Sequence, residues 1–64
     1  MERYTKNGLY GTITQEYSSK GSLYYLKGES TEAEKQILID GLSIRHNSMT
    51  GCLIQVVSKG WRKA

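Results

Sequence analysis

The alternation of apolar and polar residues over the first half of the chain predicts three antiparallel strands. Asn7-Gly8 is a dipeptide favoured by two-residue type I′ hairpins, because both central residues of that turn take positive φ. It joins a short strand at Arg3–Lys6 to a longer strand at Leu9–Tyr17. A second turn at Ser18–Gly21 leads into a third strand at Ser22–Lys27. Consecutive strands joined by tight turns form an antiparallel meander.

These turns set a register that divides the predicted sheet into two faces, since successive side chains of a strand point to opposite sides. The apolar face, which we expect to be buried, carries Tyr4, Leu9, Ile13, Tyr17, Tyr24 and Leu26. The polar face combines tyrosines with threonines and charged side chains: Arg3, Thr5, Tyr10, Thr12, Thr14, Glu16, Leu23, Tyr25 and Lys27.

One amphipathic helix is predicted after the meander. Thr31 and Glu34 have the spacing of a capping box, and acidic residues in a first turn suit the positive end of the helix dipole. Small and apolar residues then recur at helical spacing, at Ala33, Ile37, Leu38, Gly41 and Leu42. We expect this stripe to pack on the apolar face of the sheet.

Two endings of the helix fit the sequence equally well. The helix either continues to Asn47, with Ile44 on its apolar stripe, or stops at Gly41 as its C-cap glycine. In the second case residues 42–46 form a short extra strand that pairs with the segment Cys52–Val57 and sets His46 opposite Cys52.

The segment Cys52–Val57 is apolar on both sides of an extended chain, interrupted only by Gln55. Such a strand is typical of a sheet centre or a subunit interface. In a chain this short we favour an interface, with Leu53, Ile54, Val56 and Val57 as its residues. Ile39, which projects away from the apolar stripe of the helix, adds to the expectation of a homodimer.

Composition strengthens that expectation. The chain has 64 residues, and a domain of this size hides only about 60% of the surface that its unfolded form exposes. A single cysteine and a single histidine allow neither an internal disulfide nor a four-ligand zinc site within one chain. We therefore predict one small α+β domain over residues 1–64, with a short basic tail at 59–64, that forms a homodimer in the cytoplasm.

Catalysis and cofactor binding find little support in the sequence. One histidine cannot serve as both acid and base, and Cys52 has no orienting partner beyond His46. No glycine-rich phosphate loop occurs, and acidic residues surround the start of the predicted helix. No apolar run has the roughly 18 residues of a membrane span. We expect a non-enzymatic protein without metal or cofactor.

Charge and aromatic residues favour nucleic acid as the partner, and DNA more than RNA. The net charge is +3, and rings beside cations can stack on bases while the cations bind phosphates. This hypothesis assigns the contact to the polar sheet face and the basic tail, through Arg3, Tyr10, Tyr25, Lys27, Lys59, Trp61, Arg62 and Lys63. A solvated sheet face explains the same residues without a ligand.

The alternative is a protein-binding inhibitor or adaptor, of the kind found among phage and plasmid accessory proteins. It would act by strand addition at an open sheet edge or by docking of Trp61. The sequence leaves open whether Trp61 is exposed or folds back over the edge of a small core.

Overall fold

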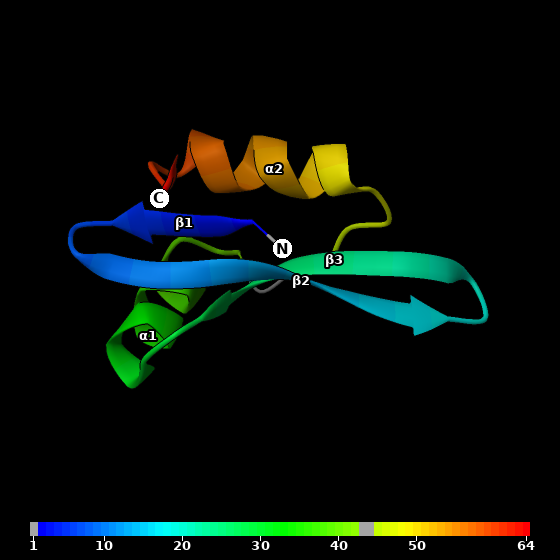
Figure 1. Ribbon diagram of the computed structural model, residues 1–64, viewed down its shortest axis with the longest axis horizontal. Helices are drawn as coiled ribbons and strands as arrows, with labels where there is room; N and C mark the ends of the chain where they lie inside the picture. The colour runs from blue at the N-terminus through cyan, green and yellow to red at the C-terminus, as the bar shows by residue number, and fades with distance from the viewer. Residues whose placement is uncertain (1, 43–44) are drawn as a thin grey trace.

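The computed structural model describes residues 2–42 and 45–64 and shows an α+β fold (Figure 1). Its four strands form one antiparallel sheet in the order β3-β2-β1-β4, and two helices pack against it. In chain order the elements are β1 (Arg3–Lys6), β2 (Leu9–Ser18), β3 (Gly21–Gly28), α1 (Thr31–Ile39), α2 (Met49–Ser58) and β4 (Arg62–Lys63).

The predicted meander and its register are confirmed. Asn7 and Gly8 both have positive φ, at 51° and 80°, as a type I′ turn requires. Arg3 lies opposite Thr12, and Ile13 lies opposite Leu26, so the polar and apolar faces contain the residues that the alternation predicts.

Both helices cover the apolar face of the sheet, because side chains from that face and from both helices form a single core. Ala33 and Ile37 of α1 and Cys52 and Val56 of α2 are all buried. The core cluster consists of Tyr4, Ile13, Leu26, Ile37, Leu42, Cys52, Val56 and Trp61.

Tyr17 is the exception on the apolar face, since 84% of it is exposed. Of the ten residues of β2, only Leu9–Thr12 pair with β1. The hairpin of β2 and β3 therefore continues as a two-stranded arm beyond the rest of the sheet, on the right of Figure 1. Tyr17 lies on this arm, where no helix covers it.

The helix α1 begins one residue earlier than the capping box predicts. Ser30 is the N-cap, and its hydroxyl accepts from the Ala33 N–H at 3.2 Å. Glu34 reaches back to accept from the Gly28 N–H at 2.9 Å, which is the reciprocal contact of a capping box displaced along the chain. The helix ends at Ile39, and Gly41 follows with φ 75°.

This ending decides between the two alternatives for residues 40–47. Continuation of α1 to Asn47 is wrong, and Gly41 supplies the left-handed conformation that ends the helix. Of the extra strand at 42–46, His46 forms an isolated bridge with Tyr24, and residues 43–44 lie outside the described part of the chain. The expected pairing with Cys52–Val57 is wrong, because that segment is helical.

The prediction of a C-terminal apolar strand is therefore also wrong. Ser48 caps α2 by accepting from the Gly51 N–H at 3.0 Å, a signal that hydrophobic periodicity does not contain. Met49, Cys52, Leu53 and Val56 recur at helical spacing and meet the core. β-Branched residues cost a helix only tenths of a kcal/mol each, whereas burying one such stripe yields several kcal/mol.

The C-terminal segment turns back onto β1 at Gly60, whose φ is 96°. Arg62 and Lys63 then pair with Thr5 and Tyr4, so the predicted basic tail is in part an edge strand. Trp61 is fully buried at 0% exposure, and its indole N–H donates to Asp40 Oδ2 at 2.9 Å. Trp61 thus folds back over the core and is not exposed.

Candidate functional site

The four sheet residues predicted to bind nucleic acid share the polar face, but the structure gives the charged ones acidic partners. Arg3 forms two hydrogen bonds with Glu29, from Nε to Oε2 at 2.8 Å and from Nη2 to Oε1 at 3.0 Å. This contact raises the pKa of Arg3 and lowers the pKa of Glu29. The Arg3 guanidinium also lies 4.0 Å from the centre of the Tyr10 ring.

The same arrangement recurs at the β3 side of this face. Arg45 Nη1 lies 2.8 Å from Glu16 Oε1, and the Arg45 guanidinium lies 5.2 Å from the centre of the Tyr25 ring. Lys27 Nζ lies 3.8 Å from Glu34 Oε1. Both tyrosine rings thus have a guanidinium over them, and a stacked base would have to displace it.

The register confirms that Arg3, Tyr10, Tyr25 and Lys27 share one face, but the sequence does not indicate the side chains that contact them. The capping-box pattern assigns Glu34 to the start of the helix, and the candidate nucleic-acid contacts do not include Arg45. The sequence does not indicate this position of Arg45, because it follows from the fold: His46 bridges Tyr24 of β3, and the adjacent Arg45 reaches Glu16.

Ion pairing concentrates the surplus charge on a few residues. The chain has nine Lys and Arg and six Asp and Glu, and all of them belong to the described residues. The five ion pairs leave four cations and one acid unpaired, which is the net charge of +3. The unpaired groups are Lys20, Lys35, Lys59, Arg62 and Glu32.

The predicted tail residues divide in the same way. Lys59 and Arg62 are exposed and in no ion pair, whereas Lys63 Nζ lies 3.0 Å from Glu2 Oε2. Hydrogen bonding to Glu2 raises the pKa of Lys63. With Trp61 buried, two of the four predicted tail contacts remain as free surface cations.

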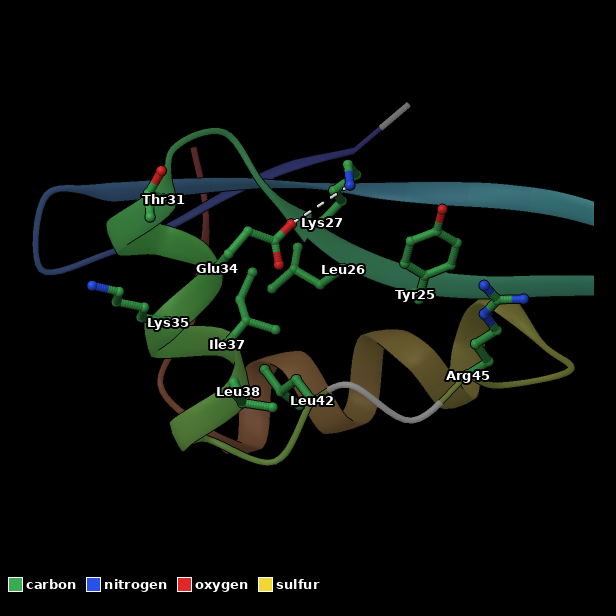
Figure 2. Close-up of a pocket in the computed structure, with 10 residues that line it drawn as sticks. All are labelled: Tyr25, Leu26, Lys27, Thr31, Glu34, Lys35, Ile37, Leu38, Leu42 and Arg45. Carbon is green, nitrogen blue, oxygen red and sulfur yellow. Dashed lines mark ion pairs between the residues drawn. The ribbon is translucent and has the colours of Figure 1, made fainter.

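A groove of about 460 Å³ lies beside β3, between α1 and the segment that carries Arg45 (Figure 2). Its apolar side chains come from β3, from α1 and from the turn after α1: Leu26, Ile37, Leu38 and Leu42. Its polar side chains are Tyr25, Lys27, Thr31, Glu34, Lys35 and Arg45. Tyr25 and Lys27, predicted as nucleic-acid contacts, are therefore also groove residues.

The chemistry of the groove suits an anionic group attached to an apolar body. Leu38 is an exposed aliphatic side chain at the groove, with 67% of its surface accessible. Lys35, one turn of α1 away, has no acidic partner among the ion pairs of the described residues. The ion pair between Lys27 and Glu34 is long and exposed, so it contributes little to stability. A carboxylate of a ligand could therefore take the place of Glu34 beside Lys27 at little cost in free energy.

A second exposed apolar surface lies on α2. We call Thr50, Leu53, Ile54 and Val57 the outer stripe of α2, because they recur at helical spacing beside the buried stripe. Ile54 is 65% exposed and Val57 is 57% exposed. Of the residues predicted at a dimer interface, Val56 is in the core, Leu53 is half-buried, and only Ile54 and Val57 face outward.

Features of a catalytic or metal centre are sparse. Within residues 2–42 and 45–64, no group of three or more His, Cys, Asp or Glu side chains is placed to hold a metal ion. Cys52 is buried, and desolvation raises the pKa of its thiol. No described helix has the length and apolar character needed to span a bilayer.

No protein-family model, no curated protein and no solved structure matches this sequence. Function is therefore inferred from the surfaces themselves.

Proposed function

We propose that this chain is a small non-enzymatic binding protein whose partner is another protein, and that the groove beside β3 receives a short segment of that partner. The segment would contain an aliphatic side chain next to a carboxylate. The observation that carries this proposal is that the exposed Leu38 and the unpaired Lys35 both line one groove.

Size and charge support a peptide segment of this kind. Binding pockets commonly measure about 300–1,000 Å³ and combine an apolar lining with a few polar groups, and the groove of about 460 Å³ falls in that range. Three cations and one acid line it, so its local charge is positive. An aliphatic anchor would cover Leu38, and a neighbouring Asp or Glu would lie near Lys35.

Selection of peptides from a random displayed library tests this proposal and does not require the partner to be identified first. The protein should enrich peptides that pair Leu, Ile or Val with Asp or Glu. Leu38→Lys and Lys35→Glu should each weaken binding of the selected peptides by about tenfold or more, the loss of about 1.4 kcal/mol. Leu38 and Lys35 are exposed, so neither substitution should disturb folding.

Ile39→Lys is the matched control, because Ile39 is an exposed aliphatic residue of α1 that does not line the groove. It should bind the selected peptides as the unmodified protein does. Absence of any enriched sequence, or equal binding by the Leu38→Lys variant, would contradict a peptide-binding groove.

A second candidate function is binding of DNA, and the distribution of charge favours it. The surplus positive charge resides on exposed, unpaired cations, and Lys59 and Arg62 lie three residues apart. Arg3 and Lys27 would join this surface only if their ion pairs opened. Tyr10 and Tyr25 would join it only if the guanidinium over each ring moved away. The charges on the sheet face are balanced as it stands, so we rank this function second.

Fluorescence anisotropy with a labelled DNA duplex tests whether the protein binds DNA. Phosphate contacts release counterions, so affinity should fall steeply between about 50 and 300 mM salt. The double variant Lys59→Gln/Arg62→Gln should lower the salt slope by roughly two contacts. No binding at the lowest salt concentration would exclude DNA as the partner.

A further inference from the structure

The helix α2 differs from α1 in having apolar residues on two sides. Toward the core it buries Cys52 and Val56, with Met49 and Leu53 packed against the same cluster. On the adjacent side its outer stripe leaves Ile54 and Val57 in water at 65% and 57% exposure. An amphipathic surface helix has one apolar stripe, whereas a helix that is apolar around most of its circumference is normally buried around most of it.

Charge makes the contrast sharper. The exposed side of α1 carries Glu32, Glu34 and Lys35, but α2 contains no charged residue from Met49 to Ser58. On a chain with nine cations and six acids, ten consecutive uncharged residues on a surface helix are conspicuous. The polar residues that α2 does carry are small or neutral.

We propose that a second copy of this chain covers the outer stripe, with α2 of one copy packed on α2 of the other about a twofold axis. In such an isologous contact each surface meets a second copy of itself, so a charge close to the twofold axis would face its own copy. The outer stripe has none, which makes it suited to self-association in a protein with net charge +3. A partner selected by charge would instead leave a charged rim on this helix.

The small size of the domain gives the same contact a thermodynamic reason. Domains of this length have little buried apolar surface, and subunit association is one of the few ways to add to it. Burial of two aliphatic side chains per copy contributes about as much as two additional core residues. This inference is independent of the proposed groove, because no residue of α2 lines the groove.

Sedimentation equilibrium over a range of about 5–500 µM tests the proposal. The unmodified protein should sediment as a dimer in the micromolar range. Ile54→Lys and Val57→Lys should each raise the dimer dissociation constant by about 100-fold or more, because each places two ammonium groups in one desolvated contact. Ile54→Ser should raise the constant by a smaller factor of about ten.

The sequence pattern links Ile39 to the dimer, but Ile39 belongs to α1, where it is 77% exposed, and lies outside the outer stripe of α2. Ile39→Lys therefore serves as the control, since it makes the same chemical change at an exposed aliphatic residue. It should dimerise normally. Circular dichroism must show each variant folded, and the neutral Ile54→Ser keeps the test valid if a lysine variant unfolds. An unmodified protein that remains monomeric at about 500 µM, or an equal loss with Ile39→Lys, would overturn the proposal.

The two proposals fail separately. Leu38→Lys should leave the dissociation constant of the dimer unchanged, and Ile54→Lys should leave selection of peptides by the groove unchanged. Monomeric protein that still binds peptides would refute the second copy on α2 and leave the groove intact.

Discussion

The N-terminal meander and the C-terminal half of this chain differ in the residues that they expose to solvent. The outer face of the meander carries several charges, and Arg3, Lys27 and the neighbouring Arg45 each meet a glutamate. In the C-terminal half the largest aromatic side chain, Trp61, is fully buried while Ile54 and Val57 are exposed. On the outer face of the meander the charged side chains form ion pairs, whereas the C-terminal half leaves apolar side chains exposed.

This difference shows why charge alone is a poor guide to the binding surface here. Of the basic and aromatic residues predicted to bind nucleic acid, all except Lys59 and Arg62 have a partner in the chain or are buried. The surfaces that expose apolar side chains are the groove beside β3 and the outer stripe of α2. The pattern of the sequence does not mark the residues of either surface as exposed.

The largest expected effect comes from removing the anchor of the C-terminal half. Trp61→Ala should destabilise the fold by about 3–5 kcal/mol, because it leaves a cavity in a core of only a few side chains. That amount approaches the whole stability of a small domain. Urea unfolding followed by circular dichroism measures it.

Trp61→Phe keeps most of the ring but removes the hydrogen bond to Asp40, so its loss should be markedly smaller. If Trp61→Ala unfolds at the same urea concentration as the unmodified protein, Trp61 does not anchor the C-terminal segment.

An intermediate effect is expected from Asp40, which joins the two halves. Its carboxylate accepts from Lys6 Nζ at 2.9 Å, from Trp61 Nε1 at 2.9 Å and from Gln36 Nε2 at 3.0 Å. Burial alone would raise the pKa of Asp40, but these hydrogen bonds outweigh it and hold the pKa below its ordinary value of 3.8. Asp40→Ala leaves their donors unsatisfied and should cost about 1–3 kcal/mol.

The lowered pKa also fixes the direction of the pH dependence. A carboxyl whose pKa is lower in the folded state stabilises the fold above its unfolded pKa, and that stability is lost as the pH falls through the folded pKa. Unfolding free energy should therefore decline as the pH drops below about 4. Asp40→Asn should flatten this decline, whereas Glu32→Gln, which removes an unpaired carboxylate, should leave it nearly unchanged. An equal slope in the Asp40→Asn variant would show that this carboxylate is not the controlling group.

The smallest effect on stability should come from the outer face of the meander. Glu16→Gln together with Glu29→Gln should change the unfolding free energy by no more than about 1 kcal/mol per exposed pair. The same change releases Arg3 and Arg45 and raises the net charge from +3 to +5, by loss of two carboxylates. Salt-sensitive DNA binding should therefore become stronger than in the unmodified protein. Unchanged binding in anisotropy would show that the glutamates do not neutralise this face.

The sequence predicts the meander well because its information is local. The Asn7-Gly8 turn fixes the register, and alternation then assigns each side chain to a face. The start of α1 is predicted to within a residue for the same reason, since capping depends on neighbouring side chains. These elements depend little on distant parts of the chain.

The C-terminal half is not predictable in this way. The segment Cys52–Val57 is apolar on all sides, and such a segment fits a central strand of a sheet and a buried helix equally well. The decision rests on the Ser48 cap and on packing against β3, which alternation alone does not reveal. The groove escapes prediction because it joins α1, β3 and Arg45, which meet only after folding.

Methyl NMR spectra recorded over a dilution series test the central claim most directly, because they report where the molecule meets its partner copy. We predict that dilution shifts the methyl signals of Ile54 and Val57 and leaves those of Leu38 and the outer sheet face unchanged. Spectra that do not vary with concentration, or shifts confined to the outer face of the sheet, would contradict it.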